Sequence, residues 1–533
     1  MLSESITSAG GYEGNESARW AGPRSVLQSL SRPSILIASL LVVLGIGSEV
    51  WQPFSLGFFH DDWYLFVRLH DLRAVFDLTP DRPGYHWLSW IILHIWDGSP
   101  AAFQWIKVVI NLATAASIFW LTLSIQRLFG ASSPVLAAGA ATLWLIAPWG
   151  LGYTVWATAA FTNVSLLCFC ISMVQFLRFV QRGSWVGLVL AVVLWTVSIA
   201  TYQSTWFAFI PVAFATLLAI YDQAPLRRRL LVLASVLLAI QFAGLIQTAL
   251  TTPKTRNPDL VGMLGTNLRN IWLIHVRFLG AWICGLMLVL VAGQAIAARF
   301  DSRNNYLNAR RIAAGTAMLI VGSIGSAALY ASAGYLFGGE GETSKTSAMF
   351  TFWVAMGFSV ALAADARDTR KTLIGIAASL VVTAMALFDY PAMTRPWIAS
   401  WKLQREVLQT IKGQSFPQRL QFGDVILSDV PLYVDRAAVF GAPWSITPAA
   451  LSVWADAIPD LARQGLSPVM IIPAFAPNMS WENGTLTMTP NWTMPAKRLW
   501  VWRWKTGDAA LVQTTGPLPP PPFDGLLDGP HAQ

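Results

Sequence analysis

The stretch that decides the fold is residues 33–64, PSILIASLLVVLGIGSEVWQPFSLGFFHDDWY, in which a long apolar segment leads to the adjacent acids Asp61 and Asp62. The apolar part, Pro33 to Val50, predicts a helix that crosses a membrane, because about 20 apolar residues span a bilayer. A carboxylate in the middle of such a helix costs about 2.5–3.5 kcal/mol. Two acids at the edge of a span therefore indicate a functional site. The alternative is a hydrated helix cap at the membrane surface.

The composition of the rest of the chain is typical of a polytopic membrane protein. The 533 residues are 55% hydrophobic and 12% charged, whereas soluble domains are about 25% charged. The 26 Trp residues suit the membrane–water interface. The net charge of +8 is explained by Lys and Arg in cytoplasmic loops, so no nucleic-acid partner is expected. The three Cys lie in apolar runs and are typical of core residues, not of a disulfide framework or metal site.

Basic clusters alternate with basic-poor turns along the chain, and this alternation sets the expected topology. It predicts about 11 spans and a cytoplasmic N-terminus under the positive-inside rule. Asp61, Asp62 and everything after Asp389 then lie outside. The expected spans are 33–50, 101–125, 133–148, 161–178, 185–201, 206–221, 230–250, 271–298, 312–330, 348–364 and 372–388.

The expected fold class is an all-α polytopic membrane domain followed by a small α+β extracytoplasmic domain. The predicted divisions are a disordered cytoplasmic tail (1–32), the transmembrane domain (33–388), the external domain (389–516) and a disordered Pro-rich tail (517–533). Strands are expected at Asp424–Ser428, Pro468–Pro473 and Arg498–Trp504, and helices at Ala449–Arg463 and, along the membrane, at Pro391–Lys412.

A second group of polar residues follows the acidic pair on the same external side. Residues 81–87, DRPGYHW, carry Arg82 and His86 and open a short apolar stretch that ends at Trp96. That stretch is too short to span a bilayer, and the charge alternation does not let it cross. It is therefore expected to lie in the outer interface.

Cations also recur on this side. Lys345 ends the loop GGEGETSK, residues 338–345, where it would suit a phosphate; the alternative is a Lys that extends to the interface or pairs with Glu340 or Glu342. Arg256 lies in the loop 251–270, and Arg277 follows within the next span. A charge at that depth usually faces a cavity or a lipid headgroup.

Together these residues resemble the multi-spanning glycosyltransferases of the GT-C class. The acidic pair just after the first span is similar to the acidic motif of that class. The order Asp61-Asp62-Trp63, Arg82-Pro83 and then Pro100 to Asn111 is similar to the protein O-mannosyltransferase branch and its bacterial relatives. The segment Glu342 to Gly357 resembles the late loop of the class, with Lys345 where an Arg is expected. The resemblance covers the membrane part, about the first 390 residues on the span count.

The resemblance implies an inverting transfer of one hexose or pentose from a polyprenyl-phosphate donor. The acceptor would be a cell-envelope glycan, a glycolipid or a protein. It implies Asp61 as the general base on the acceptor hydroxyl, and Asp62 as the group that orients the acceptor or the base. The expected substrate-binding residues are Tyr64, Arg82, His86, Arg256, Arg277 and Lys345.

No cofactor is required for this reaction, because a monophosphate leaving group has less charge to neutralise than a diphosphate. Two adjacent carboxylates raise the pKa of each other unless a cation intervenes. Arg82 could supply that cation, and a divalent metal is the alternative. The expected location is a bacterial inner membrane with a periplasmic active face and surrounding membrane lipid, the alternative being an ER membrane with a lumenal face.

Three other functions stay open at this point. A transporter or lipid flippase would carry acids and bases within its spans, but the deep spans here carry few charges and no internal repeat is apparent. An O-antigen ligase or polymerase would depend on Arg and His in a large late external loop. A non-catalytic assembly protein would use the external domain as its working part.

Overall fold

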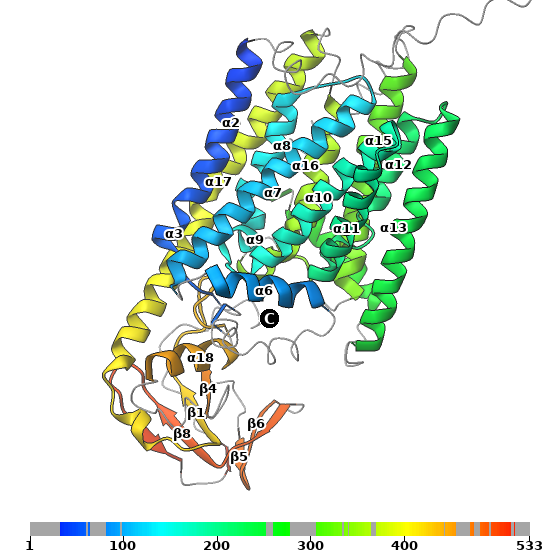
Figure 1. Ribbon diagram of the computed structural model, residues 1–533. Coiled ribbons are helices and arrows are strands. Elements are labelled where there is room, and N and C mark those ends of the chain that lie inside the picture. Colours follow the sequence, from blue (N-terminus) through cyan, green and yellow to red (C-terminus); the bar gives the residue numbers. More distant parts are fainter. Residues whose placement is uncertain are drawn as a thin grey trace, which may run out of the picture.

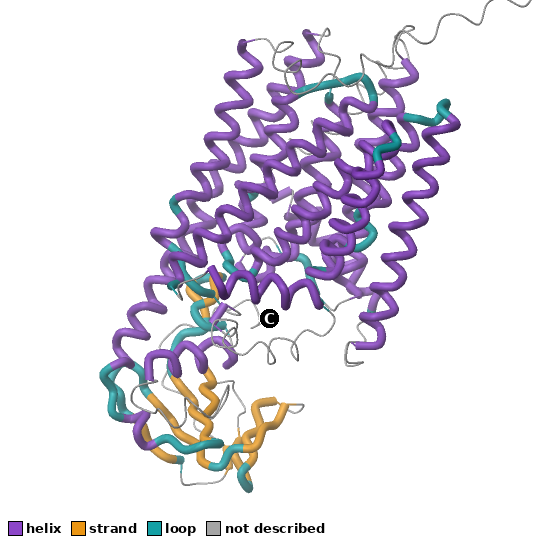
Figure 2. The backbone as a smooth tube through the Cα atoms, viewed as in Figure 1, coloured by secondary structure: helices purple, strands orange, loops and turns teal. Residues whose placement is uncertain are grey.

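The protein is a helical bundle with a small sheet-containing domain at one end (Figures 1 and 2). The computed structural model describes residues 32–59, 62–63, 82–95, 99–251, 259–274, 276–277, 305–332, 335–338, 341–363, 369–441, 443–454, 469–473, 480–489, 492–512 and 516–517. The predicted tails fall outside these ranges, except Arg32, which begins the first helix, and Pro517, which ends the last strand.

Within the described residues, seven helices are long and apolar enough to cross a membrane, or eight if one bent pair counts as a span. The bent pair joins Pro134–Ile146 to Pro148–Val155 at 54°. The larger number expected from the sequence is not confirmed. Two of the expected spans are shorter helices, and most of 271–298 lies outside the described residues. The bundle helices are α2 (Arg32–Val50), α7 (Pro100–Leu128), α8 (Pro134–Ile146), α10 (Ala159–Arg182), α11 (Trp185–Thr201), α12 (Phe209–Ala219), α13 (Ala224–Thr251), α15 (Asn305–Ser332), α16 (Ala348–Leu362) and α17 (Thr369–Lys412).

Local sequence explains where several of these helices begin and end. The helices α7 and α8 each start with a Ser-Pro pair: the Ser99 hydroxyl accepts from the Ala102 amide, and the Ser133 hydroxyl accepts from the Leu136 amide. A serine cap followed by proline is a strong helix start. Gly183 ends α10 in the left-handed conformation with φ of 67°, which costs glycine little.

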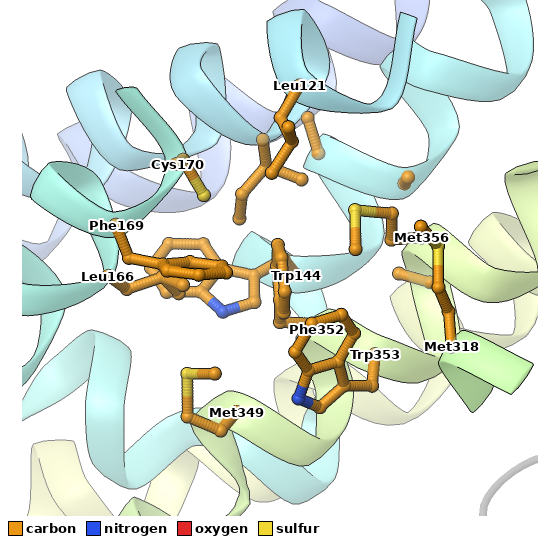
Figure 3. Close-up of a cluster of buried hydrophobic side chains, with 14 of the residues drawn as sticks. Leu121, Trp144, Leu166, Phe169, Cys170, Met318, Met349, Phe352, Trp353 and Met356 are labelled. Atoms are coloured by element: carbon orange, nitrogen blue, oxygen red, sulfur yellow. The ribbon is translucent and has the colours of Figure 1, made fainter. Parts of the chain in front are cut away.

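The core of the bundle is packed with aromatic and sulfur-containing side chains. Trp144 of α8, Phe169 of α10 and Trp353 of α16 meet in its centre, beside Met349 and Met356 (Figure 3). Each of these side chains is at most 1% exposed. Burying a large apolar side chain contributes about 1.5–3 kcal/mol, so this cluster holds helices from both halves of the chain together.

One end of the bundle is closed by short elements, two of which carry the predicted site residues His86 and Lys345. They are α3 (Gln52–Ser55), α6 (Pro83–Ile95), η3 (Pro148–Gly150), α9 (Leu151–Val155), η4 (Gln203–Thr205) and η5 (Gly341–Ser347). The helix α6 lies across the ends of the bundle helices (Figure 1) and packs on α11. This arrangement agrees with the prediction that the apolar stretch after Arg82 does not cross the bundle.

The last helix, α17, connects the bundle to the C-terminal domain without a break. It runs for 44 residues and contains Pro391 and Pro396. The helix predicted at Pro391–Lys412 is confirmed as the second part of α17, but it continues the preceding helix without a break, so the predicted division at 388 falls inside α17. Contacts on the far side of the two prolines explain the continuity: the Trp397 ring packs 4.9 Å from Phe59, and the Ser400 hydroxyl donates to the Ala438 carbonyl.

The C-terminal domain has a four-stranded sheet in the order β4-β1-β8-β9. Strand β1 pairs in parallel with β4 and with β8, and β9 is antiparallel. The three predicted strands are confirmed as β1 (Asp424–Ser428), β4 (Val469–Pro473) and β8 (Arg498–Trp502). The predicted helix begins earlier than expected, as α18 (Pro443–Trp454). The remaining elements are η6 (Phe416–Arg419), β2 (Tyr433–Val434), β3 (Ala437–Ala438), β5 (Ser480–Glu482), β6 (Thr485–Thr489), β7 (Trp492–Pro495), β9 (Ala509–Leu511) and β10 (Gly516–Pro517).

Candidate functional site

A cavity of about 130 Å³ lies at the end of the bundle that carries α6 and η5. It is built from five separate parts of the chain and combines cations with aromatic rings, which is typical of a ligand site. Its described lining residues are Arg82, Tyr85, Trp156, Thr158, Ala159, Thr162, Tyr202, Tyr330, Tyr335, Lys345 and Thr346.

Two of the predicted substrate-binding cations, Arg82 and Lys345, meet in this cavity although they are far apart in the sequence. The Arg82 guanidinium lies 4.7 Å from the centroid of the Tyr202 ring. The Lys345 ammonium lies 4.1 Å from the centroid of the Trp156 ring. Cation–π contacts of this kind hold a charged group over an apolar surface. The cavity therefore presents two oriented cations on aromatic walls.

The segment with Lys345, η5, is fixed tightly against α9. The Ser344 hydroxyl accepts a hydrogen bond from the Gly152 amide at 2.7 Å, and the Ser347 hydroxyl donates to the Trp149 carbonyl at 2.8 Å. A Cβ atom on Gly152 would lie 2.5 Å from the backbone nitrogen of Lys345. Only glycine lets the two backbones approach this closely.

Asp62 lies directly behind one wall of the cavity. Its carboxylate accepts from the amides of Phe59 (2.8 Å), Thr158 (2.8 Å) and Ala157 (3.3 Å), and the residue is 2% exposed. Ala157 and Thr158 immediately precede α10, where helix amides favour an anion. The described residues 56–59 and 62–63 are called the acidic segment below. Because Thr158 lines the cavity, the Asp62 carboxylate ties the acidic segment to the cavity wall.

The neighbours of Asp62 fasten the same acidic segment to α7 and α17. The Trp63 indole donates to the Gln404 side chain at 2.7 Å, and the Gln104 amide donates to the Gly57 carbonyl at 2.6 Å. Gly57 itself packs against the face of Trp401, where a Cβ atom would collide with the ring. The acidic segment is thus held from three sides.

The other predicted site residues lie elsewhere or outside the described residues. His86 is 1% exposed within α6 and is not among the described lining residues of the cavity. Arg277 is exposed in a helical segment whose described part begins at residue 260, and it is also not among the lining residues. Asp61, Tyr64 and Arg256 lie outside the described residues. The described part of the chain holds no group of three or more His, Cys, Asp or Glu side chains placed for a metal ion.

The sequence reasoning missed a buried polar network that lies beside Asp62 in the membrane bundle. Glu49 of α2 and Lys107 of α7 are both 0% exposed. Lys107 donates to the side-chain oxygen of Gln52, and the Asn111 amide donates to Glu49 at 2.8 Å. The available signal was Lys107 itself, a charge within the expected span 101–125. Charges at that depth default to a functional role.

The comparisons with known proteins leave the family open. No protein-family model matches the chain, and no curated protein sequence matches it. Among solved structures, the crystal structure of ArnT from Cupriavidus metallidurans in the apo state is similar at 14% sequence identity. The similarity covers 82% of this chain and 88% of that one with a TM-score of 0.31. A TM-score of this size is too low to support an argument about function or site.

Proposed function

We propose that the protein is a membrane glycosyltransferase of the GT-C type. In this proposal it moves one sugar from a polyprenyl-phosphate donor to an acceptor at the extracytoplasmic face of a bacterial inner membrane. The observation that carries the proposal is the meeting of Arg82 and Lys345 in one aromatic cavity, whose wall residue Thr158 is hydrogen-bonded to Asp62.

The cavity suits the headgroup of such a donor. A single phosphate needs one or two cations, and Arg82 can bind two of its oxygens at once while Lys345 acts as a point charge. Tyr202, Tyr330 and Tyr335 add ring faces for a sugar and hydroxyls for its polar groups. The lipid tail would extend among the bundle helices.

Asp61 is the proposed general base, because it is adjacent to the residue that is fixed to the cavity wall. It takes the proton of the acceptor hydroxyl as the acceptor oxygen attacks the anomeric carbon. The bond from that carbon to the phosphate oxygen breaks, and polyprenyl phosphate leaves with the electron pair. Attack from the face opposite the phosphate inverts the anomeric centre. The proposed acceptor is a cell-envelope glycan, a glycolipid or a protein.

The test is a transfer assay with the full chain purified into lipid vesicles. The donors are a panel of polyprenyl-phosphate-linked hexoses and pentoses, membrane extract supplies the acceptor, and released polyprenyl phosphate is measured. Lys345→Ala removes one phosphate contact, and we expect it to raise the donor KM about 10–100-fold, since a hydrogen bond to a charged group contributes about 1.5–3 kcal/mol.

The matched control for this variant is Lys402→Ala, because Lys402 is exposed on α17. It should leave the donor KM at the parent value. A parent chain that releases no polyprenyl phosphate from any donor in the panel would remove the proposed function. A Lys345→Ala variant with the parent donor KM would remove Lys345 from the phosphate site.

A second candidate, a lipid-linked glycan flippase, is favoured by one observation. Glu49 and Lys107 form a buried pair of opposite charge inside the bundle, and such pairs mark transport pathways in many carriers. The same assay separates the two functions. A flippase moves the donor across the vesicle membrane intact, whereas a glycosyltransferase releases polyprenyl phosphate.

A further inference from the structure

The helix α7 carries a line of buried polar side chains that the proposed reaction does not use. Gln104, Lys107, Asn111 and Thr114 are each 0% exposed. Their spacing of three, four and three residues puts all four on one face of the helix. This group, called the α7 polar stripe below, faces α2 and α3 on one side and α9 and α10 on the other.

The two amide side chains of the stripe bridge these two sides. Gln104 donates to the Gly57 carbonyl at 2.6 Å and to the Val155 carbonyl at 3.3 Å. Asn111 donates to the Glu49 carboxylate at 2.8 Å and to the Thr154 carbonyl at 3.2 Å. On one side, each amide binds a residue that precedes Asp62 in the sequence. On the other side, each amide binds α9, which directly precedes the cavity residue Trp156.

The two remaining members extend these links. Thr114 donates to the Asn163 carbonyl at 3.1 Å, and the Asn163 amide donates back to Asn111 at 2.7 Å, so α10 joins the network. Lys107 donates to Gln52 and also interacts electrostatically with both Glu49 and Asp62. The cation of α7 is thus hydrogen-bonded to the α3 residue Gln52 and has two acids, Glu49 and Asp62, near enough to interact with its charge.

Burying these groups is costly, and packing alone does not require them. Removing two charges from water costs several kcal/mol per ion, and apolar residues of similar volume often replace a buried ion pair without loss of stability. A site that must hold its reactive group within about 0.5 Å needs fixed support behind it. The stripe supplies such support where the acidic segment meets α9.

We propose that the α7 polar stripe, together with Glu49, positions the acidic segment against residues 154–158, and that this positioning supports the catalytic role proposed for Asp61. Gln104 binds the segment directly at Gly57. Lys107 and Glu49 are positioning residues in this view, because they act through Gln52 and Asn111 and touch no substrate. The inference rests on the proposed function for its link to catalysis. The claim that the stripe holds the segment can be tested without turnover.

The test uses the double variant Glu49→Gln with Lys107→Met in the full chain. This variant removes both charges of the pair together, and the glutamine introduced in place of Glu49 can still accept from Asn111. We expect kcat to fall about 10–100-fold, since a misplacement of about 1 Å costs that much, with the donor KM within about twofold. Hydrogen–deuterium exchange at the amides of Phe59, Ala157 and Thr158, which bind Asp62, should become about tenfold faster.

The matched control is Gln126→Met. Gln126 is a fully buried amide at the other end of α7 and binds Ser359 and the Ser133 amide. It should lower stability but leave kcat and the exchange of the three amides unchanged. If the α7 polar stripe served stability alone, the double variant would also keep the parent kcat.

The two proposals fail in distinguishable ways. A double variant with the parent kcat and the parent exchange rates would overturn the positioning role while the proposed function stands. A parent chain that releases no polyprenyl phosphate would overturn the proposed function and the link to catalysis. The exchange rates would then still decide whether the stripe holds the segment.

Discussion

Two pairs of oppositely charged side chains, one in the bundle and one in the C-terminal domain, are built differently. Asp424 in the C-terminal domain binds Arg498 through two hydrogen bonds, at 2.9 and 2.6 Å, and the Arg498 side chain is 28% exposed. In the bundle, Glu49 and Lys107 are 0% exposed and are joined through Gln52, which accepts from Lys107 and donates to Glu49. Asn111 donates a further hydrogen bond to Glu49. The first pair shares its charge with water, whereas the second has only protein around it.

The difference suggests two roles: the pair Asp424 and Arg498 stabilises the C-terminal domain, whereas the pair Glu49 and Lys107 supports the candidate site. Asp424 and Arg498 lie opposite each other on the paired strands β1 and β8, far along the chain from the cavity residues. The bonds to Asp424 raise the pKa of the Arg498 guanidinium. A raised cation pKa adds stability at every pH below the ordinary value, so this arginine contributes equally across the neutral range. The bundle pair, by contrast, is linked through Asn111 to the Thr154 carbonyl of α9, two residues before the cavity residue Trp156.

The largest expected effect is on the bundle pair. Lys107→Met alone leaves Glu49 buried without its cation, and we expect the free energy of unfolding to fall by about 3–5 kcal/mol. Denaturation of the purified protein in detergent measures this change. The double variant with Glu49→Gln should recover most of the loss. If the free energy of unfolding of Lys107→Met lay within about 0.5 kcal/mol of the parent value, the range of ordinary surface substitutions, the bundle pair would not differ from a surface pair.

Asp424→Asn should have a smaller effect, confined to stability. It weakens the charged bonds to Arg498 and the bond from the Trp500 indole at 3.0 Å. We expect the free energy of unfolding to fall by about 1.5–3 kcal/mol, the contribution of a hydrogen bond to a charged group. Sugar transfer should stay at the parent rate, as it should in the exposed control Glu406→Gln. A loss of transfer beyond that of the control would show that the pair supports the site.

Gly152→Ala should have the smallest effect and should act on donor binding. The added Cβ atom would lie 2.5 Å from the Lys345 backbone nitrogen and would push η5 away from α9. We expect the donor KM to rise about threefold, which corresponds to less than about 1 kcal/mol. The control is Gly47→Ala, whose Cβ atom meets nothing within 4 Å. Equal donor KM values in the two variants would contradict the fixed position of Lys345.

Much of the fold could be predicted because its signals are local. The apolar run from Pro33 predicted α2, and the short β-rich runs predicted β1, β4 and β8 nearly to the residue. The short apolar stretch after Arg82 could be predicted not to cross the bundle, because it is too short to span a bilayer. Arg82 and Lys345 could be chosen as site cations from their place in the expected topology, although their meeting in one cavity depends on packing.

The remainder depends on contacts that no local pattern records. The prolines 391 and 396 favour a break in the helix. The packing of Trp397 on Phe59 and the hydrogen bond from Ser400 to the Ala438 carbonyl keep α17 continuous. Glu49 is typical of the edge of a span in the sequence, and its importance follows only from Asn111 and Lys107 on another helix. The binding of Asp62 to the amide of Thr158 likewise joins residues that are distant in the sequence.

The central claim is that Asp61 is the base in sugar transfer from a polyprenyl-phosphate donor, and the Asp61→Asn variant tests it most directly. The measurement is released polyprenyl phosphate from the purified full chain in vesicles, beside Glu406→Gln as the exposed control. We expect kcat to fall about 10²–10⁴-fold, the usual contribution of a general base, with membrane insertion and donor KM unchanged. An Asp61→Asn variant that transfers sugar at the parent rate would contradict the account.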